Sequence, residues 1–436
     1  MKIAVVGGGS TYTPELIDGF ARLADQVSIT EIVLVDPDQS RLAVVGPFSA
    51  RIMRAYGHPA MVRWTSDLDD GLDGAGAVLI QLRIGGQAAR QRDETWPGKC
   101  GCLGQETTGA GGFAKALRTV PVVLDIAERT RARASSDAWL IDFTNPVGIV
   151  TRALLDAGHR AVGLCNVAIG FQRIFAGWLG VEPERVSLEH VGLNHLTWER
   201  AVLVDGTDVL PDLIASRGDE LAEHLGVPRS VLEQTRSIPS YYLRYFYAHD
   251  QVVAEQRTEP TRAERVAEIE QQLLEMYADP ALDHKPELLG QRGGAFYSEA
   301  AVALLASLVN DTRDTQVVNV RNNGTMPFLA DDAVIEVASV VGNDGATPVG
   351  FAPISPLMRG LIAHVSAYEE LAVEAARLGG RDRVYEAMLA HPLIGQYDLA
   401  EQLTDLLLAE NAAFLPWADG PGTGDGPAPG TTASGP

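Results

Sequence analysis

The sequence predicts an α/β protein whose N-terminal part is built on a mostly parallel sheet and whose C-terminal part is α+β. Short apolar runs alternate with helical patterns over the first half of the chain, which is typical of a parallel sheet covered by helices on both faces. After about Glu189, long helical stretches with a few strands replace that alternation. The 436 residues, 46 % of them apolar, suffice for two substantial lobes.

Charge and composition narrow the classes of partner. The chain carries 57 acidic and 35 basic residues, a net charge of −22, which argues against nucleic acid or an anionic membrane as a partner. An anionic substrate therefore needs a local basic pocket. No apolar run approaches the length of a membrane span, and Met1-Lys2 leads directly into a strand, so we expect no signal peptide. Three cysteines make no disulfide framework, and we expect a cytoplasmic protein.

The first unit of the chain is a strand, a glycine turn, a helix and a second strand. The two strands are predicted at Ile3–Val6 and Ile32–Val35. The helix between them is predicted to have Thr13 as N-cap and Pro14 at its first position. At the very N-terminus this pattern is typical of a Rossmann-like dinucleotide-binding domain, although any α/β protein can contain a plain strand–turn–helix corner.

The glycine turn and the end of the second strand supply the candidate cofactor contacts. Glycines let the backbone approach a pyrophosphate, and the N-terminus of the helix favours its charge. A carboxylate after the second strand would accept hydrogen bonds from ribose hydroxyls and repel a 2′-phosphate, so NAD is predicted rather than NADP. Tyr12 stands where the third glycine of the G-x-G-x-x-G fingerprint is usual. The candidate residues are Gly7, Gly8, Gly9, Ser10, Thr11 and Asp36.

The remaining pattern divides the chain into two domains and a tail. In residues 1–188, further strands are predicted at Ala77–Leu82, Ala138–Phe143 and Ala161–Leu164, and helices at Ser40–Ala55 and Pro121–Ala134. In residues 189–415, strands are predicted at Thr197–Val204, Val317–Val320 and Val334–Val341, and long helices at Asp212–Leu225, Thr261–Tyr277, Ser298–Val309 and Met358–Leu378. Residues 416–436 are rich in Gly, Pro, Thr, Ser and Ala, and are predicted to be disordered.

A cysteine and a histidine are candidate metal ligands. Cys165 follows the strand at Ala161–Leu164, and ligands bind such sheets at the carboxyl ends of their strands. His195 closes the Gly192-Leu193-Asn194-His195 segment thirty residues later. A thiolate and an imidazole suit a divalent transition metal, and two ligands leave positions open for substrate hydroxyls. The alternative is that both residues are structural, as most buried cysteines are.

Polar residues between the strands are candidate ligand contacts. Asn145 precedes a proline and is therefore held extended, so its amide could face a ligand or belong to an ordinary turn. Glycines and polar groups mix over residues 104–112, which suits a loop against a ligand. Arg83, Arg90 and Arg92 could bind phosphate or carboxylate through paired hydrogen bonds, or form a solvated face.

Residues 241–247 are dense in aromatic side chains in a chain that is only 6 % aromatic. The simplest interpretation is a helix that packs its rings. A tyrosine can act as a general base only when a nearby cation or metal lowers its pKa from about 10. Arginines follow this segment at Arg257, Arg262, Arg265 and Arg292.

Taken together, these segments resemble glycoside hydrolase family 4, and within it the 6-phospho-β-glucosidases. The resemblance extends from Met1 to about Phe414. Tyr12 in place of the third glycine is itself the pattern of the family. The matching motifs are residues 7–16 (GGGSTYTPEL), 104–107 (GQET), 145–146 (NP), 163–166 (GLCN), 192–195 (GLNH) and 321–324 (RNNG).

The resemblance implies an unusual hydrolysis that does not use the common carboxylate pair. Bound NAD⁺ takes a hydride from C3 of the sugar, which acidifies the C2 proton. A tyrosine removes that proton, the aglycone leaves from C1, water adds, and the hydride returns. A divalent metal, Mn²⁺ in the family, binds the C2 and C3 oxygens as a Lewis acid. The family's fold is similar to that of lactate and malate dehydrogenases, and its members form dimers or tetramers.

The resemblance also implies roles for individual residues. Cys165 and His195 would bind the metal. Tyr242 matches the base, with Tyr241 as the competing assignment one position away. Glu106 matches a carboxylate that raises the basicity of that tyrosine.

Four more residues match positions on the substrate side. Arg90 and Asn145 match substrate contacts, and Arg262 a substrate arginine near the phosphate. Asn166 stands where the family's α-glycosidases tend to have an acidic Asp, which favours the β-type. The alternatives are the same chemistry on an α-linked, uronide or unphosphorylated glycoside, or a non-catalytic protein that senses NAD.

Overall fold

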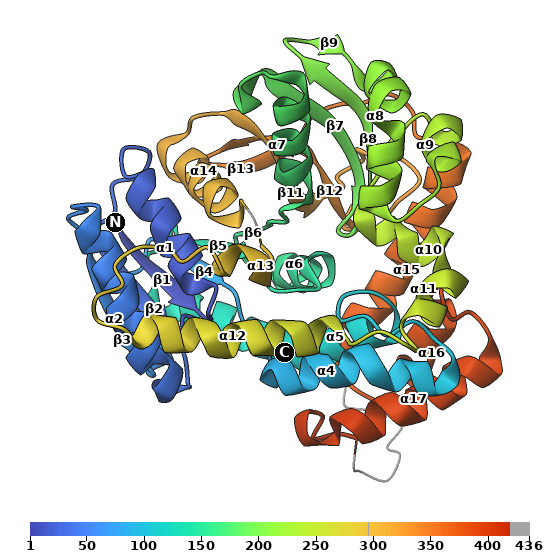
Figure 1. Cartoon of the computed structure of the whole chain (residues 1–436). Coiled ribbons are helices and arrows are strands. Elements are labelled where there is room, and N and C mark those ends of the chain that lie inside the picture. The colour runs from blue at the N-terminus through green and yellow to red at the C-terminus, as the bar shows by residue number, and fades with distance from the viewer. Residues whose placement is uncertain (295, 419–436) are drawn as a thin grey trace, which may run out of the picture.

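The computed structural model describes residues 1–294 and 296–418, and one sheet of thirteen strands runs through both halves of this chain (Figure 1). The N-terminal half contributes six parallel strands, because buried apolar runs alternate with helices that return the chain to the same edge. In their order across the sheet they are β3 (Met61–Thr65), β2 (Glu31–Val35), β1 (Lys2–Val6), β4 (Ala77–Ile80), β5 (Trp139–Asp142) and β6 (Ala161–Gly163).

Antiparallel strands from the C-terminal half extend the same sheet beyond β6. The junction is the pair Asn319 and Gly163, which joins β11 to β6. The added strands are β11 (Asp314–Arg321), β12 (Val334–Gly342), β7 (Val186–Leu193), β8 (Leu196–Val204) and β10 (Ile238–Pro239), with β13 (Gly345–Pro348) on β12 and β9 (Thr207–Asp208) on β8. Residue 188, the predicted domain boundary, lies within β7, and the division into two domains stays a prediction.

Helices of the N-terminal half cover the parallel strands. Most of their inward residues pack with those of the strands in the largest apolar core, whereas Phe171, Phe175 and Ala176 of the last helix belong to a second core with residues between 186 and 238. They are α1 (Thr13–Arg22), α2 (Gln39–Ala55), α3 (Leu68–Leu72), α4 (Gly86–Thr95), α5 (Gly109–Arg133), α6 (Val147–Asp156) and α7 (Val167–Leu179), with 3-10 turns η1 (Trp96–Cys100) and η2 (Pro183–Arg185).

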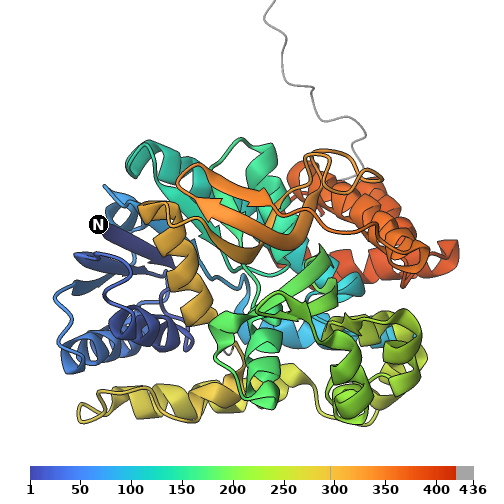
Figure 2. The same ribbon diagram turned by 90° about the horizontal axis from the view of Figure 1, so that it is seen from above.

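The C-terminal half is mainly helical. Its helix α12 packs on α2 and α4 of the N-terminal half and lies along one side of the molecule, opposite the orange antiparallel strands (Figure 2). The helices are α8 (Leu210–Leu225), α9 (Arg229–Thr235), α10 (Arg244–Tyr247), α11 (His249–Glu255), α12 (Arg262–Ala278), α13 (Leu289–Arg292), α14 (Tyr297–Asn310), α15 (Pro356–Leu378), α16 (Arg381–Ala390) and α17 (Tyr397–Asn411), with η3 (Tyr241–Leu243) and η4 (Ala412–Phe414).

Two predicted helix starts are wrong. Helix α1 begins at Thr13 after Tyr12 as N-cap, and the Thr13 hydroxyl instead accepts a hydrogen bond from Gln81 at 2.8 Å. Helix α5 begins at Gly109 and not at Pro121, so Gly109–Gly112 form its first turn rather than a loop. The glycines permit close helix packing, because a Cβ at Gly111 would lie 2.3 Å from the carbonyl oxygen of Asp93.

The predicted tail, residues 416–436, begins within the described part of the chain. Residues 416–418 form a turn, and the ring of Trp417 lies where a Cβ on Gly379 would approach it to 2.8 Å. The rest of the tail, residues 419–436, lies outside the described residues. Among the helices of residues 1–294 and 296–418, none is long and apolar enough to cross a membrane.

Candidate active site

A cavity of about 1500 Å³ opens at the carboxyl ends of the parallel strands. Parallel α/β sheets bind ligands at this edge. Side chains from α12 and from the 241–257 segment of the C-terminal half close the other side. The residues that line the cavity directly after β1, β2, β4 and β5 include Gly7, Asp36, Gln81 and Phe143, and Asn166 lies three residues beyond the end of β6.

One end of the cavity is the glycine turn. The amides of Gly7 and Gly8 both donate to the carbonyl oxygen of Val35 at 2.9 Å, which pulls the turn onto β2. A Cβ on Gly8 would lie 2.7 Å from the Leu34 Cβ, so only glycine permits this approach. A backbone with no side chains in the way suits the close approach of a pyrophosphate, so the turn fits a dinucleotide.

Asp36 stands at the end of β2 beside this turn. Its carboxylate accepts hydrogen bonds from the amides of Gly9 at 3.0 Å and Asp38 at 2.9 Å. Burial raises the pKa of Asp36, although the two amide bonds and Arg41 oppose that rise. The residue lines the cavity, and its contact with ribose hydroxyls stays a prediction.

His195 sits at the tight connection between β7 and β8, with a positive φ of 63°. Its Nδ1 lies 3.0 Å from the Thr107 hydroxyl, which leaves Nε2 as the nitrogen for a metal. Burial lowers the pKa of His195 to about 4, so the imidazole is in the neutral form that binds metals.

Cys165 follows β6 and is buried, and it lies near the same tyrosine as His195. Burial, with the charge of Glu336, raises the pKa of the Cys165 thiol. Burial, and to a smaller extent the charge of Cys165, raises the pKa of Tyr242. The His195 ring stacks on the Tyr242 ring with centroids 3.5 Å apart. No group of three or more His, Cys, Asp and Glu side chains in residues 1–294 and 296–418 could hold a metal. The pair therefore fits only an open site, in which other molecules complete the coordination.

The two adjacent tyrosines differ in their surroundings. Tyr242 is half-buried against His195, whereas Tyr241 is 40 % exposed and its hydroxyl accepts a hydrogen bond from Arg244 at 3.0 Å. Only Tyr242 is therefore held against a candidate metal ligand.

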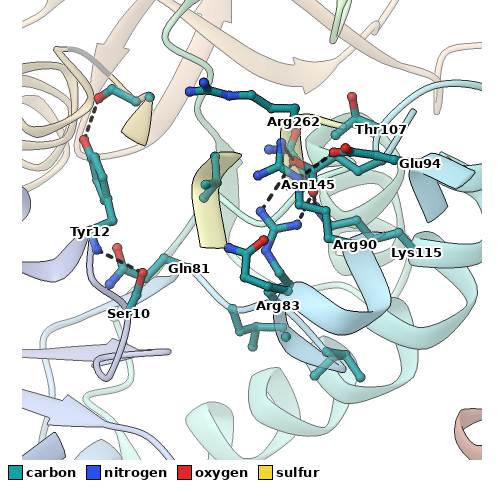
Figure 3. Close-up of a pocket in the computed structure, with 18 of the residues that line it drawn as sticks. Ser10, Tyr12, Gln81, Arg83, Arg90, Glu94, Thr107, Lys115, Asn145 and Arg262 are labelled. Carbon is teal, nitrogen blue, oxygen red and sulfur yellow. Dashed lines mark hydrogen bonds and ion pairs between the residues drawn. The ribbon is translucent and has the colours of Figure 1, made fainter. Parts of the chain in front are cut away.

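Glu106 is surrounded by three cations, Arg83, Arg90 and Lys115, which are labelled in Figure 3. Arg83 contacts its carboxylate, Arg90 lies 3.2 Å from Oε1, and Lys115 lies 2.8 Å from Oε2. Although burial raises the pKa of Glu106, these cations hold it well below its usual value. Burial and Arg83 lower the pKa of Lys115 to about 8. The carboxylate is therefore ionised at neutral pH, and its single charge is smaller than that of the three cations around it.

Arg90, Asn145 and Arg262 also line the cavity. Arg90 is fixed by Glu94, whose carboxylate accepts from its Nε at 2.7 Å. The buried Oδ1 of Asn145 has no hydrogen-bond partner among the described residues, so a donor from a ligand would satisfy it. Arg262 donates to the carbonyl oxygens of Gln291 and Arg292 at 2.9 and 3.1 Å.

Behind the candidate metal ligands lies a buried polar network. His190 sits between Glu199 at 2.6 Å and Glu336 at 3.0 Å, and these carboxylates outweigh burial to raise the pKa of His190 to about 10. Glu336 also accepts from Asn194 at 2.8 Å and Asn319 at 2.9 Å. One imidazolium between two carboxylates leaves negative charge behind Cys165, which favours a cation there.

Most of the predicted site residues line this one cavity. They are Gly7, Ser10, Asp36, Arg90, Glu106, Asn145, Asn166, His195, Tyr242 and Arg262. The other predicted residues are not among the lining residues but are adjacent to them in the sequence: Gly8, Gly9, Thr11 and Cys165. Arg92 on α4 is not among the lining residues.

The prediction overlooked Lys115 and Glu336. Each carries a detectable signal, because each is a lone charged residue in an otherwise small or apolar run, Phe113–Leu117 and Val334–Val341. A charge within a buried run needs a partner, which points to a polar site.

Comparisons with known proteins agree with this geometry. The model of the family 4 glycosyl hydrolases matches residues 2–181, and the model of their C-terminal domain matches residues 190–394. A protein of Bacillus subtilis named as a probable 6-phospho-β-glucosidase is 37 % identical, over 95 % of this chain and 97 % of its own.

Solved structures are similar as well. The 6-phospho-β-glucosidase of Thermotoga maritima, solved with manganese, NAD⁺ and glucose 6-phosphate, has a TM-score of 0.90 and 33 % identity over 95 % of this chain and 99 % of its own. Malate dehydrogenase of Plasmodium falciparum, solved with NADH, has a TM-score of 0.53 at 13 % identity over 89 % of this chain and all of its own, a likeness of fold alone. The predicted fold class and family are confirmed. The chain belongs to family 4 of the glycosyl hydrolases.

Proposed function

We propose that the protein hydrolyses 6-phospho-β-glucosides with the help of NAD⁺ and a divalent metal. The observation that carries the proposal is the stacking of Tyr242 on His195, 3.5 Å apart, in a cavity that begins at the glycine turn. A candidate base, a candidate metal ligand and a dinucleotide site therefore share one space. Relatives solved with NAD⁺, manganese and glucose 6-phosphate support this combination.

The two bound groups divide the difficult chemistry between them. When bound, NAD⁺ would take a hydride from C3 of the sugar and return it at the end, and Mn²⁺ would polarise the C2 and C3 oxygens as a Lewis acid. Cys165 and His195 would hold the metal, and Asp36 with Gly7, Gly8, Gly9, Ser10 and Thr11 would hold the dinucleotide.

Tyr242 is the base in this proposal. Its phenolate would remove the C2 proton once C3 is a ketone, and the electron pair would expel the aglycone oxygen from C1. Burial raises the pKa of Tyr242, so the phenolate is a strong base, and it needs cationic neighbours to form. Arg90 opposes the rise in pKa, whereas the charge of Glu106 adds to it and strengthens the base.

The cationic side of the cavity would hold the sugar phosphate. Arg90 and Arg262 supply positive charge, and the unpaired oxygen of Asn145 would accept from a sugar hydroxyl. Asn166 cannot donate a catalytic proton, so the departing oxygen would be protonated by water. That arrangement favours β-linked substrates, whose leaving group needs no acid from this position.

A substrate panel tests the proposal. We expect hydrolysis of an aryl 6-phospho-β-glucoside that requires both NAD⁺ and Mn²⁺, and incorporation of deuterium at C2 in D₂O. Rates on the α-linked and unphosphorylated glucosides should be much lower. Turnover that persists after chelation and removal of NAD⁺ would overturn the mechanism, and a faster rate on a plain or α-linked glycoside would overturn the substrate assignment.

Two further expectations belong to the same proposal. We infer a cytoplasmic location, where phosphorylated sugars are available, and a homodimer or homotetramer. Light scattering on the purified protein tests the oligomeric state, and cell fractionation tests the location.

A further inference from the structure

Arg292 reaches from α13 of the C-terminal half to the glycine turn of the N-terminal half. Its Nε lies 2.7 Å from the hydroxyl of Thr11, and its Nη2 lies 3.4 Å from the hydroxyl of Ser10. The guanidinium carbon is 5.7 Å from the centre of the Tyr12 ring. Arg292 therefore brings a positive charge to the turn, and Arg292 lines the cavity together with Gly7 and Ser10 of that turn.

Glu270 of α12 holds this arginine in place. Its Oε1 accepts from Arg292 Nη2 at 2.9 Å and from the Thr11 hydroxyl at 3.0 Å. Arg41, which also donates to the carbonyl oxygen of Gly9 at 2.8 Å, lies 3.6 Å from the other Glu270 oxygen. Glu270 is thus shared by two arginines, and the Asp36 carboxylate lies near Arg41, so Arg292 is the arginine of this cluster whose charge is left for an anion at the turn.

The backbone that carries Arg292 also contacts the substrate side. Arg262, at the start of α12, donates to the carbonyl oxygens of Gln291 and Arg292 at 2.9 and 3.1 Å. Two residues later, the carbonyl oxygen of Gly294 accepts from the Tyr12 hydroxyl at 2.8 Å. Residues 291–294 therefore connect Arg262, a proposed contact of the sugar phosphate, with the glycine turn.

We propose that Arg292 binds the pyrophosphate of the dinucleotide and that residues 291–294 couple its binding to that of the sugar phosphate. This inference rests on the proposed function for the identity of the two ligands. An anion at the turn draws Arg292 toward itself, and the same backbone segment positions Arg262. Linkage then requires that each ligand tightens the binding of the other by the same factor.

Calorimetric titration of NAD⁺, with and without glucose 6-phosphate, tests the inference without turnover. In the unmodified protein we expect glucose 6-phosphate to tighten NAD⁺ binding about fivefold or more. Arg292→Met should weaken NAD⁺ binding about tenfold to hundredfold and abolish the coupling. The NAD⁺ affinity of Arg292→Lys should lie between those of the unmodified protein and Arg292→Met, because lysine keeps the charge but not the planar pair of donors.

Two further variants separate binding from folding. Glu270→Gln keeps a side-chain oxygen that can accept from Arg292 but removes a competing negative charge, and it should tighten NAD⁺ binding about threefold, whereas a purely structural ion pair predicts only a lower unfolding temperature. Arg217→Met, on the exposed face of α8, should change neither the NAD⁺ affinity nor its coupling to glucose 6-phosphate.

The outcomes distinguish this inference from the proposed function. An unmodified protein that binds no NAD⁺ overturns both. NAD⁺ binding that Arg292→Met leaves unchanged, in a folded protein, overturns only the role of Arg292. Coupling that survives in Arg292→Met overturns the link through residues 291–294.

Discussion

The cavity has a dinucleotide end, at the glycine turn and Asp36, and a reacting end, around Glu106, His195 and Tyr242. The two ends are built in different ways. The dinucleotide end comes mainly from one continuous stretch, β1 to Asp36, in which each turn residue contacts the neighbouring parallel strand. The reacting end combines segments far apart in the sequence, since His195 bonds Thr107 and stacks on Tyr242. Residues of the first end are near one another in the chain, whereas those of the second meet only in the folded protein.

This difference has a chemical consequence. The dinucleotide end offers the glycine turn, the Asp36 carboxylate and the cluster of Arg292, Glu270 and Arg41, which suit the binding of an anionic dinucleotide. The reacting end concentrates buried charges, with a cationic cluster around Glu106 and a carboxylate network behind Cys165. Substitutions at the reacting end should therefore change turnover most, and substitutions at the dinucleotide end should change affinity.

The largest expected effect is at the tyrosine pair. Tyr242→Phe should lower kcat about a thousandfold, because it removes the proposed base, and should leave NAD⁺ binding unchanged. Tyr241→Phe is the matched control, since that ring is exposed, and its kcat should stay within about threefold of the unmodified protein. Steady-state kinetics on an aryl 6-phospho-β-glucoside measure both. The reverse pattern would assign the base to Tyr241.

The next effect concerns the metal. Cys165→Ser should weaken Mn²⁺ binding about a hundredfold, because the thiolate is one of only two protein ligands in the proposal. Cys102→Ser, at another buried free cysteine, should bind Mn²⁺ as the unmodified protein does. Electron paramagnetic resonance of free Mn²⁺ gives the affinities. Equal affinities in the two variants would show that Cys165 is not a ligand.

A smaller effect is expected at the dinucleotide end. Asp36→Asn should weaken NAD⁺ binding about tenfold and narrow the preference for NAD⁺ over NADP⁺, because the repelling charge is lost. Asp38→Asn keeps a side chain that can accept from the Arg41 amide at the start of α2, and should leave both affinities unchanged. Fluorescence titration with the two dinucleotides compares them. An unchanged preference in Asp36→Asn would separate this carboxylate from the ribose.

The smallest effect is expected at Glu369 of α15, and it concerns the pH dependence of stability. It lines a cavity of about 30 Å³ together with Thr107 and His195. Burial raises its pKa from the ordinary 4.5 to about 8, against the opposing charge of Arg152. Because the pKa is higher in the folded than in the unfolded protein, the protonated carboxyl group stabilises the fold. This contribution is fully present below pH 4.5 and is lost as the pH rises through about 8.

Glu369→Gln should therefore remove a fall in the free energy of unfolding between pH 5 and 8, of at most about 1.4 kcal/mol per pH unit. Urea unfolding at several pH values measures this slope. Glu374→Gln, on the exposed face of the same helix, serves as the control and should keep the slope of the unmodified protein. Parallel slopes in Glu369→Gln and the unmodified protein would mean that the carboxyl titrates normally.

The sequence alone predicted the β1-to-β2 unit, the Asp36 carboxylate and the strand ends that carry Asn145 and Cys165. These features depend on short-range patterns: apolar alternation, a glycine turn and polar residues directly after buried strands. The start of α5 was misplaced because its glycines suit a loop as well as a tightly packed helix, and only the neighbouring carbonyl of Asp93 distinguishes the two.

Tertiary structure decided which charges meet. Nothing in the sequence places Glu336 near Cys165 or Arg292 on the glycine turn, because each contact joins elements that are far apart in the chain. It also decided that the two halves share one sheet through β6 and β11. Local periodicity determines the strands and helices, whereas burial and long-range pairing determine the ionisation and partners of the groups that would do the chemistry.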